Sequence, residues 1–347
     1  MTATGRRGTP WLVGPAHDLL LYSGTGLLSA LFVLVAARWV EPIRLFFALN
    51  VGCTLTHYAP TWLRAYGDRE ERRRNRCAVW LFPPAVVVLA AATWERQTVL
   101  AFVLYAWDRF HAVMQNYGFA RLYDAKHAGA PARWRRLDLA WLTAMAAMLT
   151  AWNMGLLVPL LEQLERVGIP IAHRRAVMTG IRATTTTVAV VITAIWLWDT
   201  VRRTRIDGRI NSGRLAFLAL ITAGHGVMNT TTNVFLLGAH EKVYHSVQYC
   251  VLVWHYNRKR VAHARPDDVS PLLRWTAGPR GLWVYVGVLT LWTSIVFAID
   301  AAWFRPLVGA SGNTGLYTAL FAALALTHYY FDSFLWRVRR ADIRANL

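Results

Sequence analysis

The chain has 347 residues, of which 55% are hydrophobic and only 16% are charged, and its formal net charge is +19. Soluble domains usually carry about 25% charged residues, so this composition excludes a disordered chain and argues against a soluble globule. Three cysteines, at 53, 77 and 250, are too few and too scattered for a disulfide framework or a CxxC zinc site. The arginines fall in short connections between apolar runs, which argues against nucleic acid as a partner.

About ten stretches of the chain are candidates for transmembrane helices, which need about 20 mainly apolar residues each. They lie near residues 19–40, 43–63, 78–94, 97–119, 138–160, 183–200, 215–238, 241–257, 283–303 and 315–336. These stretches and their connections use nearly the whole chain and leave no room for a soluble catalytic domain. The sequence therefore predicts an all-α fold, a polytopic integral membrane bundle of about ten transmembrane helices, with residues 1–347 forming a single transmembrane domain.

The basic residues predict how this bundle is oriented. With Arg6 and Arg7 in the cytoplasm, 28 of the 38 Arg and Lys residues fall on the cytoplasmic side, 9 fall on the opposite side and Arg109 falls inside a span. Because cytoplasmic loops carry an excess of Arg and Lys, both termini are expected in the cytoplasm. The same excess predicts contact with anionic lipid headgroups. We expect the chain in a bacterial inner (plasma) membrane.

Five of the predicted spans carry histidine inside their apolar sequence. Ionisable side chains inside a bilayer are costly and usually face the interior of the bundle. Three spans pair a histidine with a carboxylate three or four residues away, on the same helix face. These pairs are Asp108 with His111, Glu241 with His245, and His328 with Asp332. His57 and His225 add imidazoles from two further spans.

Imidazole and carboxylate groups that project inward from several helices are the donors of di-iron sites in helical bundles. This donor set suits iron, manganese or zinc, and the lack of nearby thiolates argues against a soft metal. We expect one or two ions, with iron as the first choice. The predicted ligands are His57, His111, His225, Glu241, His245, His328 and Asp332. The pattern leaves open whether His240 is a ligand.

Further polar residues are expected to support these ligands. Partners that hold ligands in place by hydrogen bonds are predicted at Asp108, Asn229 and Gln248. Candidate catalytic residues, which would orient the substrate or donate protons, are Tyr58, Gln115 and Tyr249.

Depth in the membrane predicts which histidines meet. His57, His111 and His328 lie in the second half of spans that run from outside to inside, so we expect them at one level and in one pocket. His245 would lie closer to the outer face if its span began at residue 241. That difference disappears if the polar segment 230–242 is a broken helix that enters the bundle.

Three segments carry most of these groups: HAVMQNYG from His111, HSVQY from His245 and HYYFD from His328. In this plan the chain resembles the histidine-rich integral-membrane non-haem iron enzymes, which include desaturases, hydroxylases and other oxygenases. The HxxxH and HxxHH boxes of that superfamily are absent, and the nearest local feature is His240 with His245. The resemblance implies oxidation of an apolar or lipid-like substrate by dioxygen, with a separate electron donor as partner.

Two other classes of function use the same residues. One is an electron-transfer protein with quinone or with non-covalent haem, whose axial ligands would come from His57, His111, His225 or His328. The other is a transporter in which the polar groups relay protons or cations. For any single histidine, a hydrogen bond to a neighbouring helix is the simpler interpretation.

Overall fold

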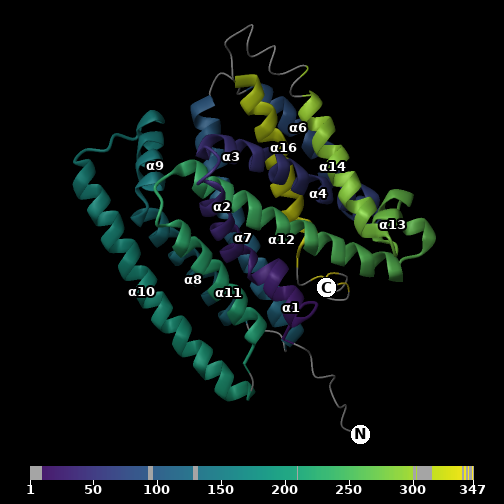
Figure 1. Ribbon diagram of the computed structural model, residues 1–347, viewed down its shortest axis with the longest axis horizontal. Coiled ribbons are helices and arrows are strands. Elements are labelled where there is room, and N and C mark those ends of the chain that lie inside the picture. Colours follow the sequence, from purple (N-terminus) through teal and green to yellow (C-terminus); the bar gives the residue numbers. More distant parts are fainter. Residues whose placement is uncertain are drawn as a thin grey trace. The chain divides into compact units, whose positions relative to one another are not determined.

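The computed structural model is all-α, which confirms the predicted fold class (Figure 1). It describes residues 10–92, 97–127, 132–208, 210–299 and 315–337, together with residues 302, 340, 343 and 346. Across these residues the only β contact is an isolated bridge between Asp68 and Val269. The chain divides into two compact units, unit 1 from residues 1–46 and 110–244 and unit 2 from residues 47–109 and 245–347. A single transmembrane domain over the whole chain stays a prediction.

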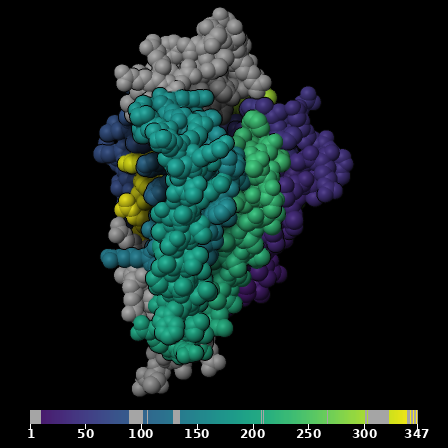
Figure 2. Space-filling view, turned by 90° about the vertical axis from the view of Figure 1, so that its left-hand side faces the viewer, coloured from purple at the N-terminus to yellow at the C-terminus, as the bar shows by residue number. Residues whose placement is uncertain are grey.

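Unit 1 is built on two helix pairs, α2 with α11 and α8 with α10. Its elements are α1 (Pro15–Asp18), the π-helical turn η1 (Leu19–Ser23), α2 (Thr25–Ala36), α8 (Ala132–Trp152), α9 (Met154–Arg166), α10 (Arg174–Asp207) and α11 (Ser212–Met228). Figure 2 looks onto α10, which runs along one face of this unit as a continuous column. α10 exposes large apolar side chains, among them Val190 and Trp198.

Unit 2 is built around α4, which packs against both α14 and α16, while α16 also packs on α6. Its elements are the π-helical turn η2 (Asn50–Leu55), α4 (Thr56–Gly67), α5 (Arg69–Arg74), α6 (Arg76–Ala92), the 3₁₀ turn η4 (Pro266–Asp268), α13 (Pro271–Ala277), α14 (Gly281–Ile299) and α16 (Gly315–Leu335). Three further helices have residues in both units: α3 (Pro42–Leu49), α7 (Gln97–His127) and α12 (Val234–His263).

The described helices offer two to four candidate membrane spans, so the prediction of about ten was wrong. By length and composition, α10 and α14 are each able to cross a membrane. Two bent pairs qualify if each is one span: α1 and η1 with α2, bent by 52°, and α8 with α9, bent by 90°. Arg6 and Arg7, which served to orient the predicted bundle, lie outside the described residues.

The predicted spans fail for two physical reasons. Some helices are too short, because α6 and α11 have 17 residues each and rise only about 26 Å at 1.5 Å per residue. α11 ends at Met228 because the polar run 229–233 follows it. Others are too polar, since α7, α12 and α16 carry the histidines and carboxylates of the predicted site. The residues that suggested a function therefore also lower the hydropathy of the helices that carry them.

A buried ionic network joins four helices of unit 1. Asp138 on α8 is fully buried and accepts hydrogen bonds from Arg121 on α7 and Arg214 on α11. The indole of Trp196 on α10 donates to the same carboxylate at 2.8 Å. Asp124 pairs with Arg121 at 2.7 Å, so two buried positive charges face two buried negative charges. Because the charges balance, the network avoids the cost of an unpaired charge in the interior.

We expect Asp138→Asn to lower the free energy of unfolding by about 3–5 kcal/mol, because it leaves two buried guanidinium groups with one carboxylate. Denaturant titration of the purified protein measures this change. The matched control is Glu165→Gln, since the Glu165–Arg174 pair is more than a third exposed and should contribute at most about 1 kcal/mol. Equal losses in the two variants would contradict a special role for the network.

Candidate metal centre

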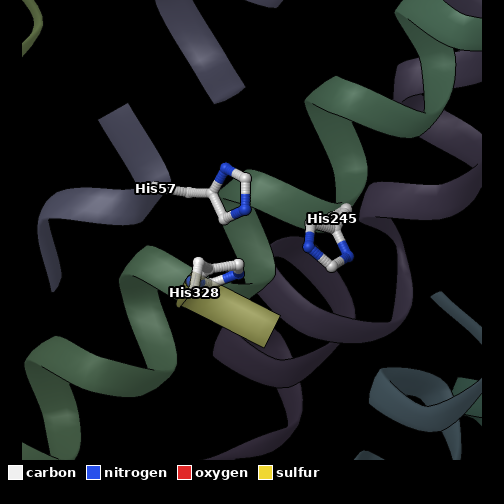
Figure 3. Close-up of side chains that lie close together, drawn as sticks. All are labelled: His57, His245 and His328. Atoms are coloured by element: carbon white, nitrogen blue, oxygen red, sulfur yellow. The ribbon is translucent and has the colours of Figure 1, made fainter. Parts of the chain in front are cut away.

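Three buried histidines from three helices of unit 2 lie together: His57 on α4, His245 on α12 and His328 on α16 (Figure 3). Their exposed fractions are 3%, 7% and 0%. The rings of His57 and His328 have centroids 4.6 Å apart and stand at 89°, and those of His57 and His245 are 5.0 Å apart at 90°. One nitrogen from each ring lies within 4.8 Å of the others.

Irregular backbone next to His57 helps to position this residue. The π-helical turn η2 ends at Leu55, immediately before α4, and π-helical turns often occur at functional sites. Pro60 lies inside α4 and has no N–H to donate to the carbonyl of Thr56. His57 therefore lies between two places where the regular helical hydrogen bonds are interrupted.

A single hydroxyl connects His328 to two other polar groups of the cluster. Thr61 Oγ1 lies 2.7 Å from His328 Nδ1 and 2.6 Å from the hydroxyl of Tyr249. Tyr249 donates its own proton to Asp332 Oδ1 at 2.6 Å, and the indole of Trp336 donates to the Tyr249 oxygen at 3.2 Å.

The donors and acceptors of this network define its direction. Because Tyr249 donates to Asp332, the Thr61 hydroxyl donates toward Tyr249 or Asp332 and accepts from the Nδ1–H of His328. His328 is then the tautomer whose Nε2 carries the lone pair. His57 has a similar contact, with Nδ1 3.3 Å from the hydroxyl of Ser246. Hydrogen bonds at Nδ1 of this kind hold metal-binding histidines in orientation.

The two ring separations that involve His57 are compatible with binding to one metal ion. An ion lies about 2.0–2.1 Å from an imidazole nitrogen, so rings bound at angles of 90° to 110° have centroids roughly 4.5–5.2 Å apart. The two measured separations, 4.6 and 5.0 Å, lie in this range. Three imidazoles leave at least one position of the ion for water or substrate. Asp332 Oδ2 lies 3.5 Å from His328 Nε2, so a carboxylate oxygen lies close to the nitrogen that would bind the ion.

A buried arginine holds the far side of the network. Arg64 is fully buried, and its guanidinium lies 3.9 Å from the ring centre of Tyr256 and 4.0 Å from that of Trp336. It also donates to the carbonyl of Leu335 at 2.8 Å, at the end of α16. Arg64 thus holds Trp336 in the place from which its indole reaches Tyr249.

The end of α4 is tied to α12 by a second arginine. Asp68 caps the N-terminus of α5 by accepting from the backbone N–H groups of Glu70 and Glu71. Arg260 on α12 donates to Asp68 at 2.8 Å, and this hydrogen bond raises the pKa of its guanidinium further above neutrality. The pair joins the helices that carry His57 and His245.

Several predicted residues of unit 2 lie beside the three histidines. The ring of Tyr58 is 4.6 Å from that of His57 and 4.9 Å from that of His328. Tyr249 lies 5.2 Å from His328, and Asp332 accepts its hydroxyl proton. Gln248 is fully buried on α12. Asp108 instead accepts a hydrogen bond from Tyr329 at 2.7 Å.

The remaining predicted residues belong to unit 1. His225 packs against His240, with ring centroids 5.2 Å apart, and Asn229 caps the end of α11. His111 and Gln115 lie on α7, and Glu241 lies buried on α12. The roles of these residues at a metal ion stay predictions.

Three supporting residues were not predicted from the sequence: Thr61, Ser246 and Trp336. Helical spacing contained a signal for two of them, because Thr61 follows His57 by four residues and Trp336 follows Asp332 by four. Hydroxyl groups are common in apolar helices, so this spacing alone did not mark Thr61 as a partner of a ligand.

The chain matches no family model, no curated protein and no solved structure. The resemblance to histidine-rich membrane iron enzymes therefore rests on the plan of the site. What the structure adds to that plan is a group of buried histidines able to hold a metal ion.

We expect Thr61→Val to weaken Co²⁺ binding at this cluster by about 10- to 100-fold, because it removes the hydroxyl that orients His328 at nearly constant shape. Thr61→Ser keeps the hydroxyl and should remain close to wild type. Equilibrium dialysis of the metal-free protein against Co²⁺ compares the two variants. Equal affinities would show that the Thr61 hydroxyl does not orient a ligand.

Proposed function

We propose that the chain is a membrane-bound, metal-dependent oxidoreductase whose ion is held by His57, His245 and His328. The observation that carries the proposal is the meeting of three buried imidazoles from three helices, with ligand nitrogens within 4.8 Å of one another. A metal ion offsets the cost of bringing such polar groups out of water.

Iron is the ion we propose, bound as one or two ions, with manganese and zinc as the other candidates. Imidazole suits iron, zinc, copper and nickel, and Asp332 provides a carboxylate next to His328. Histidines with one carboxylate are the donor set of many non-haem iron oxygenases. When bound, a reduced iron ion with open positions supplies the activation of dioxygen.

The residues around the cluster support an apolar substrate. Leu55, Tyr58, Ala325 and Tyr329 form a buried cluster made of the chain neighbours of His57 and His328. These apolar surroundings of the histidines support an apolar or lipid-like substrate. Tyr249 holds a proton at its hydroxyl oxygen, hydrogen-bonded to Asp332, next to the rings of both histidines.

The partners follow from the same features. Two to four of the helices that the structure describes are long and apolar enough to span a membrane. We propose an integral protein of a bacterial inner membrane, in contact with anionic lipids and without nucleic acid as a partner. Its substrate would be a hydrophobic small molecule, and its partner would be an electron donor.

A proton or cation relay is the second candidate function. It is favoured by the chain of hydrogen bonds that runs from His328 through Thr61 and Tyr249 to Asp332. Haem is less compatible with the site. A porphyrin would occupy the space between two axial histidines, where these imidazoles stand edge to face at 4.6 and 5.0 Å.

We expect the purified protein to contain stoichiometric iron without the intense Soret absorption of haem. His57→Ala and His328→Ala should each lose the ion held by this cluster, because each removes one of its three ligands. His263→Ala, at an exposed position at the end of α12, is the matched control and should retain it. Elemental analysis and an absorption spectrum measure both properties. Full occupancy in the two ligand variants would disprove the assignment and leave the relay as the better explanation.

The proposed orientation makes a second prediction. Cys77 is exposed and lies directly after the arginine-rich segment 69–76, which we expect on the cytoplasmic side. In a Cys53→Ser/Cys250→Ser background, a membrane-impermeant maleimide should label Cys77 in inverted vesicles and not in intact cells. Labelling in intact cells would show that Cys77 lies on the outer side and that the proposed orientation is wrong.

A further inference from the structure

Unit 1 contains a second group of histidines, none of which belongs to the first cluster. It forms where α2 crosses α11 with their backbones in contact. A Cβ atom on Gly224 would lie 2.4 Å from the carbonyl carbon of Gly26, so only glycine fits there. This close crossing brings Ser29, one turn after Gly26 on α2, to the level of His225, which directly follows Gly224 on α11.

Three rings meet at this crossing. His225 and His240 have centroids 5.2 Å apart at 87°, and Tyr244 lies 5.2 Å from His225 and 5.0 Å from His240. His240 and Tyr244 are 2% and 1% exposed, whereas His225 is half-buried. The site thus combines two imidazoles and a phenol, with access from the side of His225.

The hydroxyl of Ser29 determines the tautomer of His240. Ser29 donates to the backbone carbonyl of Gly26 at 3.0 Å, so its oxygen accepts from His240 Nδ1 at 2.8 Å. Nε2 of His240 then carries the lone pair that binds a metal. Thr61 has the same relation to His328 in unit 2, where a hydroxyl on a neighbouring helix also accepts from Nδ1.

α12 repeats one arrangement in both groups. His240 is followed four residues later by Tyr244, and His245 is followed four residues later by Tyr249. Residues four apart share a helix face, and a shift of five residues turns that face by about 140°. The two His–Tyr pairs therefore point to different sides of one helix.

We infer that His225 and His240 bind a second transition-metal ion, with the phenol of Tyr244 beside it. The ring centroids of His225 and His240 are 5.2 Å apart, at the upper end of the roughly 4.5–5.2 Å expected for two imidazoles on one ion. Imidazole donors select a borderline metal such as iron, zinc or copper over magnesium or calcium. This ion is additional to the one in the proposed function, and it has its own ligands.

Dialysis of the metal-free, full-length protein against Co²⁺ tests the inference. We expect two Co²⁺ per chain in the wild type, one in His225→Ala/His240→Ala and one in His57→Ala/His328→Ala. The visible spectra of the two double variants should add up to that of the wild type. An unchanged number of bound Co²⁺ in His225→Ala/His240→Ala would overturn the inference.

A milder variant distinguishes loss of the metal site from loss of the fold. Ser29→Ala keeps both imidazoles and should weaken one of the two Co²⁺ sites by about 10- to 100-fold, with the metal-free unfolding transition unchanged. Equal Co²⁺ affinity in Ser29→Ala and wild type would count against the site. If His57→Ala/His328→Ala still bound as many ions as the wild type while His225→Ala/His240→Ala lost one, the second site would stand and the proposed function would fail.

Discussion

The hydrogen bond between Thr61 and His328 is the interaction on which the candidate site depends. It joins α4 to α16 inside unit 2, and it gives His328 a defined tautomer. Tyr249 on α12 is hydrogen-bonded to the same Thr61 hydroxyl and donates its own hydrogen bond to Asp332. Thr61 Oγ1 therefore joins the three helices that carry the histidines. Without that acceptor, nothing among these contacts would favour a proton on Nδ1 of His328. Arg64 stacks on Trp336 and donates to the carbonyl of Leu335, so the end of α16 is also held in place.

The two units differ in how their buried polar groups are stabilised. In unit 1, Asp138 is surrounded by donors of opposite charge, and the network around it balances internally. In unit 2, the histidine cluster contains three buried imidazoles with one nitrogen of each within 4.8 Å of the others, and Asp332 Oδ2 lies 3.5 Å from His328 Nε2. A balanced ionic network stabilises a fold and needs no ligand. Three buried imidazoles from three helices form a group that could hold a metal ion, whereas the charges of the network in unit 1 are already paired.

The sequence predicted the kinds of residue at the site better than it predicted their grouping. Helical spacing paired His328 with Asp332, and the level in the membrane brought together His57 and His328, as the structure does. His245 was harder, because its level depends on the break at 229–233, which ends α11 and lets α12 begin at Val234. His225 was assigned to one common site, whereas the structure pairs it with His240, since the contact of Gly26 with Gly224 is a property of two helices and leaves no periodic signal in either. The number of spans was overestimated because π-helical turns, prolines and polar residues interrupt apolar stretches that hydropathy alone reads as continuous.

The position of α12 explains why both histidine groups are found on one element. The helix belongs to unit 1 up to Tyr244 and to unit 2 from His245 onward, and the boundary falls between the two His–Tyr pairs. Since a step of five residues turns the helix by about 140°, the change of unit coincides with a change of face. Each His–Tyr pair is thus a local feature of α12 whose two residues fall within a single unit.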